Sequence, residues 1–146
     1  EVDWPIIVML AAMIPIGTAL QTTGLSEIIA QNISNYAQNL SLFWVLFIIL
    51  VVTMATTDII NNAATAVIMA PISTGIALEL GYAIEPFLMV VAVGASCAFL
   101  TPIGHQCNTV VMGPGNYKFT DYWRLGLPMD VLIILASIPM ILFVWT

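Results

Sequence analysis

Two short polar stretches interrupt an otherwise apolar sequence, and they carry the side chains best suited to binding a solute. Residues 56–65 and residues 100–109 each combine hydroxyl and amide side chains with residues that break or cap helices. Irregular backbone inside a membrane persists only where it lines a cavity or is buried in protein, because unpaired backbone groups are costly in hydrocarbon. Paired broken helices are the sequence feature that points to a transporter's binding site. We therefore predict that these stretches, named here the first and second breaks, form such a site.

The first break has the groups needed to bind a cation and an anion together. Asparagine is a favourable helix N-cap, and the helix after Asn61 and Asn62 presents free N–H groups and the positive end of its dipole to an anion. The preceding helix ends in free carbonyls, which suit a hard cation such as sodium, and Thr57 and Asn62 add two oxygens. Asp58 is expected to be the only acid near membrane depth, where it caps a helix end or faces water rather than binding the ion.

The second break offers a hydroxyl beside freed backbone. Proline disfavours helical geometry in the residue before it, so Thr101–Pro102 leaves local backbone groups without helical partners. His105 is expected to be a loop histidine bonded to backbone, with a proton carrier as the alternative. Cys97 and Cys107 lack the spacing of a zinc site or a disulfide framework.

Composition places the whole chain in a membrane. Of the 146 residues 61% are hydrophobic and only 7% are charged, and the mean hydropathy is +1.06; soluble domains carry about 25% charged residues. The net charge of −6 comes from single, scattered acids. The two basic residues, Lys118 and Arg124, form no basic patch, which argues against nucleic-acid binding. No nucleophile–base pair or metal-ligand cluster is evident, so an enzyme is not expected.

Apolar runs of different lengths must position the two breaks. They predict an all-α, polytopic membrane protein with a re-entrant helical hairpin and a discontinuous transmembrane helix. The two arms of the hairpin flank the first break, residues 24–40 are expected to form an amphipathic helix, and the last span is expected to start at Pro128. Asn62 and Asn108 each precede a short apolar segment that a proline is expected to end. The runs in chain order are 4–20, 24–40, 42–55, 64–80, 86–100 and 126–145.

The chain is expected to be one domain, residues 1–146, within a longer polypeptide, because it starts at Glu1 without a signal-peptide pattern. Lys118 and Arg124 place the loop before the last span on the cytoplasmic side of an inner or plasma membrane.

The order of several motifs resembles the divalent anion:sodium symporter family, whose members carry sulfate and di- and tricarboxylates. Thr57–Ala66 with Met69–Ile72 is similar to its second Ser-Asn-Thr signature. Ala98–Pro102, with Asn108 and Val111–Gly115, resembles the broken helix of the family. Asp121–Pro128 resembles its entry to the last span, and Asp3–Leu25 resembles the opening of its second repeat.

The resemblance implies that this chain is the C-terminal inverted repeat of an elevator-type transporter, a homodimer whose first repeat is absent from this sequence. The coupling sodium ion would be held by Thr57, Ile60, Asn62 and Leu100. The substrate-facing residues would be Asn61, Asn62, Ala63, Thr101, Pro102 and Asn108.

Two departures from the family pattern affect substrate choice. Asn61 and Ala63 replace the signature Ser and Thr, and the family's compact Thr-Pro-Pro-Asn is lengthened to residues 101–108. The longer form resembles the sulfate-permease branch. The leading hypothesis is therefore sodium-coupled symport of an anion, with sulfate ahead of di- or tricarboxylates. A proton-coupled exchanger or exporter, using Asp58 or His105, is the first alternative, and a non-transporting membrane subunit is the second.

Overall fold

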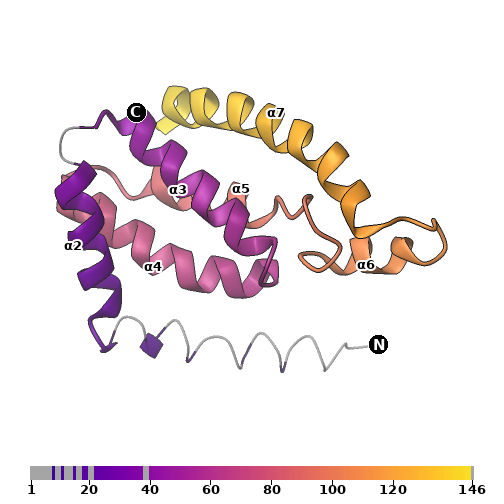
Figure 1. Cartoon of the computed structure of the whole chain (residues 1–146). Coiled ribbons are helices and arrows are strands. Elements are labelled where there is room, and N and C mark those ends of the chain that lie inside the picture. Colours follow the sequence, from indigo (N-terminus) through magenta and orange to yellow (C-terminus); the bar gives the residue numbers. More distant parts are fainter. Residues whose placement is uncertain are drawn as a thin grey trace.

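The computed structural model describes Val8, Ala11, Pro15, Thr18, Ala19 and residues 22–37 and 40–145. The predicted span at residues 4–20 lies largely outside these residues. The described part is helical and contains no strand. Its helices, shown in Figure 1, are α2 (Leu25–Ala37), α3 (Leu42–Thr57), α4 (Asn62–Leu80), α5 (Glu85–Ala95), α6 (Gln106–Met112) and α7 (Phe119–Trp145).

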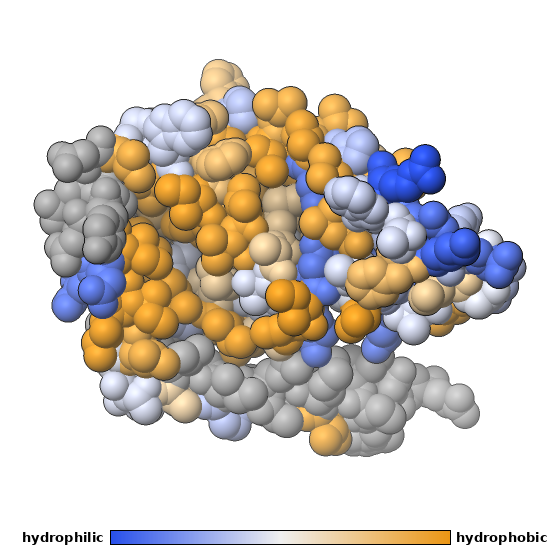
Figure 2. Space-filling model, viewed as in Figure 1, coloured by the Kyte–Doolittle hydropathy of each residue, from blue (hydrophilic) through white to orange (hydrophobic). Residues whose placement is uncertain are grey.

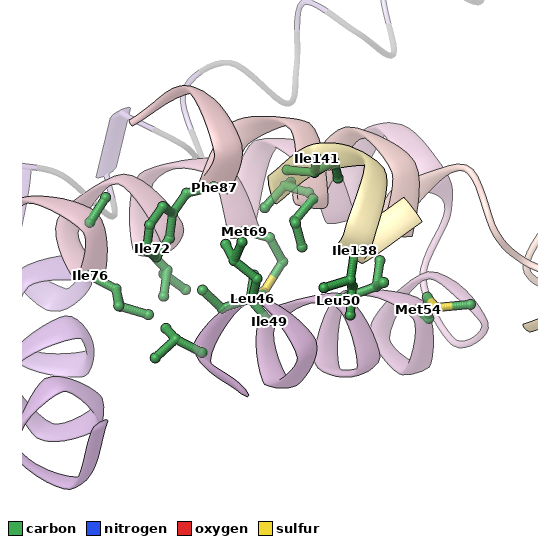
Figure 3. Close-up of a cluster of buried hydrophobic side chains, with 14 of the residues drawn as sticks. Leu46, Ile49, Leu50, Met54, Met69, Ile72, Ile76, Phe87, Ile138 and Ile141 are labelled. Atoms are coloured by element: carbon green, nitrogen blue, oxygen red, sulfur yellow. The ribbon is translucent and has the colours of Figure 1, made fainter. Parts of the chain in front are cut away.

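Helices α3, α4, α5 and α7 form a bundle around an apolar core. Helix α3 contacts α4, α5 and α7, while α2 packs against α4 at one end of the bundle (Figure 1). Each helix of the bundle contributes buried side chains, which Figure 3 shows converging between the ribbons. Those labelled there are Leu46, Ile49, Leu50, Met54, Met69, Ile72, Ile76, Phe87, Ile138 and Ile141.

The outer surface of the bundle is apolar as well. Figure 2 shows hydrophobic side chains over most of one face, with a hydrophilic cluster at the end that carries α6. Helix α7 exposes Leu132, Leu135, Met140 and Phe143. Helices α4 and α7 are long and apolar enough to cross a membrane. An apolar exterior around an apolar core is what a bundle needs in contact with lipid.

The helices that lead into the breaks are shorter than a span. Helix α3 has 16 residues and α5 has 11, and a helix needs about 20 residues to cross the hydrocarbon core. Figure 1 shows that the α3–α4 turn and the segment after α5 lie at the same end of the bundle. This arrangement agrees with interrupted helices, and whether α3 and α4 form a re-entrant hairpin stays a prediction.

Local signals set several helix ends as expected. Asn61 caps α4, since its side chain accepts a hydrogen bond from the Ala64 N–H at 2.8 Å. Gly81 ends α4 with a φ of +73°, where glycine carries no steric penalty, and the Tyr82 N–H returns to the Ala77 carbonyl. Pro86 lies in the first turn of α5.

The predictions for Pro71 and Pro128 were wrong, whereas α6, the short helix that contains Asn108, ends at Met112, just before Pro114, as expected. Pro71 lies inside α4 and does not end it, and α7 begins at Phe119, so that Pro128 and Pro139 lie within it. A proline inside a helix removes one hydrogen bond, which a long membrane helix packed against neighbours tolerates. In addition, α5 ends at Ala95 rather than at Leu100, because the backbone beyond it finds partners in the first break and in Asn108.

The α3–α5 contact depends on a glycine. A Cβ at Gly94 would lie 2.9 Å from Thr53 Cβ and 3.2 Å from Leu50 Cδ1. We therefore expect Gly94→Ala to force the helices apart and to reduce the free energy of unfolding by about 1–3 kcal/mol. Thermal unfolding of the purified complete protein in detergent measures this loss. Gly113→Ala is the matched control, since a Cβ there meets nothing within 4 Å; equal melting temperatures for the two variants would contradict the close packing.

Candidate functional site

The first break is a four-residue connection between two helices. Helix α3 ends at Thr57 and α4 begins at Asn62. Ile59 and Ile60 project from the turn, and Ile59 is 77% exposed. Thr57 and Asp58 instead point inward and are buried. The turn therefore presents its polar groups to the bundle rather than to its outer surface.

Four oxygen positions, from the first break, the end of α5 and the second break, converge beside Thr57. The Thr57 hydroxyl donates to the Ala95 carbonyl at 3.0 Å and lies 2.8 Å from the Asn62 side-chain oxygen. The same amide position lies 3.3 Å from the Ala95 carbonyl and 3.2 Å from the Gly104 carbonyl. We call this set the four-oxygen cluster: Thr57 Oγ1, Asn62 Oδ1 and the carbonyls of Ala95 and Gly104.

The Asn62 amide has two orientations with different consequences. With nitrogen turned inward it donates to Thr57 Oγ1 and to both carbonyls. With oxygen turned inward, that oxygen faces only acceptors and the amide nitrogen faces only donors, so this orientation needs a cation among the oxygens, which are of the kind that hard cations prefer. The residues present fit a bound sodium ion in this orientation alone, whereas the nitrogen-inward orientation satisfies the hydrogen bonds without an ion.

Asp58 ties the first break to the second. Its carboxylate Oδ1 accepts a hydrogen bond from the Leu100 N–H at 3.0 Å, and its carbonyl accepts one from the Thr101 hydroxyl at 2.6 Å. The Thr101 hydroxyl in turn accepts from the Gly104 N–H at 3.1 Å. Asp58 is the C-cap residue of α3, in agreement with the expected position at a helix end, but it does not face water, since it is only 5% exposed and its carboxylate bonds to a distant segment.

Asn108 holds the second break from its other side. Its amide nitrogen donates to the carbonyls of Ala98, at 2.8 Å, and Thr101, at 3.1 Å. The Tyr122 hydroxyl donates to the Asn108 carbonyl at 2.7 Å, which connects this segment to α7. Contact of Asn108 with a substrate stays a prediction, since the donors of its side chain are already in use.

Two glycines allow the backbones to approach. A Cβ at Gly104 would lie 2.8 Å from the Thr57 carbonyl oxygen and equally close to Ala98 Cβ. A Cβ at Gly126 would lie 2.7 Å from the Phe99 carbonyl carbon. Sequence reasoning missed these positions, although an isolated glycine beside a break or within an apolar helix is a known sign of close backbone approach.

The predicted sodium ligands are only partly brought together by the described contacts. Thr57 and Asn62 lie side by side, and the nearby carbonyls are those of Ala95 and Gly104. The carbonyls of Ile60 and Leu100 stay predicted ligands. The carbonyls of Ala95 and Gly104 were missed, because only the path of the chain shows which backbone oxygens meet.

The predicted substrate residues lie around the same junction. Asn61 is exposed at the N-terminus of α4, Ala63 is half-buried in its first turn, and Pro102 is buried. His105 is exposed, and its Nδ1 accepts from the Cys107 N–H at 3.1 Å at the start of α6. This is the backbone-bonded loop histidine expected from the sequence.

A second acid belongs to this region and was missed. Asp130 is 8% exposed on the packed face of α7, so the expectation that Asp58 is the only acid near membrane depth was wrong. A single acid in an apolar run does not by itself indicate which face of the helix it occupies. The spacing of four residues between Gly126 and Asp130 indicates only that the two residues share one face of the helix.

A cavity of about 500 Å³ opens between the second break and the start of α7. Its walls are mainly apolar and aromatic and include Phe99, Asn108, Tyr122 and Gly126. The cavity therefore reaches the second break at Asn108.

Comparison with known proteins agrees with a membrane transport role. An uncharacterized transporter from Synechocystis is 37% identical over 144 residues, which cover 99% of this chain and 24% of the relative. The Escherichia coli transporter YfbS, also uncharacterized, is 36% identical over 141 residues, 97% of this chain and 23% of the relative. Sodium/sulfate cotransporter 2 of Chlamydomonas reinhardtii is 27% identical over 135 residues, 92% of this chain and 15% of the relative.

The chain spans about a quarter of the length of the first two relatives. These relatives are named transporters rather than enzymes, and together with the two long apolar helices they indicate a membrane protein. The citrate transporter family CitMHS matches the chain over residues 1–146. The chain therefore belongs to the CitMHS family of citrate transporters.

Proposed function

We propose that the complete protein is a sodium-coupled anion transporter whose coupling ion binds at the four-oxygen cluster. The observation that carries this proposal is the convergence on one point of Thr57 Oγ1, Asn62 Oδ1, the Ala95 carbonyl at the end of α5 and the Gly104 carbonyl of the second break. Hard cations favour hydroxyl and carbonyl oxygens. Membership of a citrate transporter family supports transport of an anion, and the likeness to a sodium/sulfate cotransporter supports sodium as the coupling ion.

The anion is proposed to bind beside this ion without a basic side chain. Lys118 and Arg124 are both exposed and lie outside the breaks. The free N–H groups and the dipole of α4 provide an anion site at Asn62 and Ala63 instead. The other proposed substrate-facing residues are Asn61, Thr101, Pro102 and Asn108. We rank sulfate ahead of di- and tricarboxylates because the lengthened second break resembles the sulfate-permease branch and one relative is named a sodium/sulfate cotransporter, with citrate, the substrate in the family's name, as the competing substrate.

The Asn62 amide provides a physical basis for coupling the two solutes. Sodium requires the amide oxygen to face the four-oxygen cluster, and the amide nitrogen then faces outward among other donors. This arrangement suits an anion, because several donors then point to the same space. Without sodium, the nitrogen turns inward to bond three acceptors and no longer faces the anion. Sodium binding would thus create the anion site.

Other features of the proposed transporter stay predictions. They are the carbonyls of Ile60 and Leu100 as ligands, a homodimer, an elevator motion, a preceding inverted repeat, and residence in an inner or plasma membrane.

Uptake of labelled sulfate into proteoliposomes containing the complete protein tests the proposed function. We expect an inward sodium gradient to drive uptake, because the anion site needs the ion to form. Replacing sodium by choline is expected to reduce uptake to the level of empty liposomes. Labelled succinate and citrate, measured in parallel, rank the substrates. Undiminished uptake in choline, or uptake that follows a pH gradient instead, would refute sodium coupling.

Two substitutions at Asn62 separate the ion from the anion. Asn62→Asp keeps an oxygen for sodium but loses the outward N–H donors, so we expect sodium binding to persist while anion uptake falls at least about tenfold. Asn62→Ala removes both groups and is expected to abolish both, since losing one charge-assisted contact costs about 1.5–3 kcal/mol. Equilibrium binding of radioactive sodium and sulfate uptake measure the two effects. Equal loss of sodium binding in both variants would contradict the proposed role of the amide.

The Thr101 hydroxyl is expected to be needed for the junction of the breaks. Thr101→Val leaves the Asp58 carbonyl and the Gly104 N–H without this partner, at a cost of about 1–3 kcal/mol. We expect lower thermal stability and at least about fivefold slower uptake. Thr101→Ser restores the hydroxyl and is expected to restore both quantities. A Ser variant as impaired as the Val variant would show that the hydroxyl is not the important group.

A further inference from the structure

Asp130 occupies a position that the proposed function does not explain. It lies on the face of α7 that also carries buried Gly126, Ile138 and Ile141, and this helix packs against α3 and α5. An ionisable side chain inside a membrane protein is costly and marks a functional site by default. The packed location means that Asp130 faces the interior of the bundle rather than lipid.

The turn of α7 that carries Asp130 follows the turn that touches the second break. Gly126 packs on the backbone of Phe99 and Leu100, where an added Cβ would lie 3.1 Å from the Leu100 nitrogen. That nitrogen donates to Asp58 Oδ1. Because residues four apart share one helix face, Asp130 lies one turn along from this contact. The contact of Gly126 with Leu100, whose N–H binds Asp58, therefore brings the turn of α7 that carries Asp130 towards Asp58.

Each of the two carboxyls has one oxygen that lacks a partner. Asp58 Oδ2 and Asp130 Oδ1 are buried, and neither makes a hydrogen bond within the described residues. The side chains are 5% and 8% exposed, respectively. The two basic side chains of the sequence, Lys118 and Arg124, are exposed. Two buried carboxylates without compensation are strongly unfavourable, and a cation bound between them would provide that compensation.

We propose that Asp58 Oδ2 and Asp130 Oδ1 bind a second sodium ion, separate from the four-oxygen cluster. The inference rests on the proposed function, because the charge count includes the ion at that cluster. The cluster consists of neutral ligands, so its ion leaves one full positive charge beside two carboxylates. The two carboxylates and the ion at the cluster together carry a net charge of −1, which one further monovalent cation neutralises, whereas a divalent cation would leave a net positive charge. Asp58 Oδ1 accepts a hydrogen bond from the Leu100 N–H, so Asp58 would then connect this second ion to the second break.

Equilibrium binding of radioactive sodium to the purified complete protein tests this site. We expect Asp130→Asn to bind one sodium ion fewer per protein than the wild type, and its sulfate uptake to depend on sodium with a Hill coefficient lower by about one. Glu79→Gln is the control, since it removes one negative charge from an exposed position on α4 and is expected to bind the full number. An unchanged sodium count in Asp130→Asn would overturn the proposal.

A wild-type measurement keeps the proposal testable even if the variant fails to fold. In crystals of the wild-type protein soaked with thallium, which replaces alkali cations, we expect an anomalous peak between Asp58 and Asp130 besides the one at the four-oxygen cluster. A peak at the cluster alone would overturn the second site and leave the proposed function standing. A peak between the two carboxyls without sodium-dependent uptake would reject the proposed function and support the site.

Discussion

The hydrogen bonds of Asp58 to the second break are the interaction on which the candidate site depends. Backbone that leaves helical geometry at membrane depth must find partners within the protein. Asp58 accepts hydrogen bonds from the Leu100 N–H and the Thr101 hydroxyl. These two partners lie 42 and 43 residues further along the chain, so Asp58 joins the two breaks. Asn108 satisfies carbonyls on the opposite side. The second break is therefore held in place by side chains rather than by a helix.

The remaining features of the site follow from this junction. Once the breaks are joined, the Ala95 carbonyl reaches the Thr57 hydroxyl and the Gly104 carbonyl reaches the Asn62 amide, and Gly104 and Gly126 permit the close backbone contacts that this requires. The short α3 and α5 then end side by side at one end of the bundle (Figure 1). A site built mainly from backbone oxygens and one amide can bind an ion and release it again, because it offers no charged side chain as a direct ligand. Acids placed just behind it adjust the charge of the region.

The sequence was sufficient to locate the breaks but not to assemble them. Asn61, Gly81 and Pro86 carry local signals that do not depend on the rest of the chain, so the helix ends they set were predictable. Carbonyl ligands were not, since every residue has a carbonyl and only the chain path selects those that meet. The burial of Asp130 was not predicted, because which face of α7 is buried depends on how that helix packs against its neighbours. The last span was predicted to start at Pro128, which was wrong because membrane helices tolerate proline in their interior.

Sodium binding at the four-oxygen cluster can be tested by a structure of the complete protein determined in sodium chloride. We expect density for an ion within coordination distance of Thr57 Oγ1, Asn62 Oδ1 and the carbonyls of Ala95 and Gly104, and we expect this density to be lost when choline replaces sodium. A structure in saturating sodium that shows no ion at the cluster and the Asn62 amide nitrogen turned inward would contradict it.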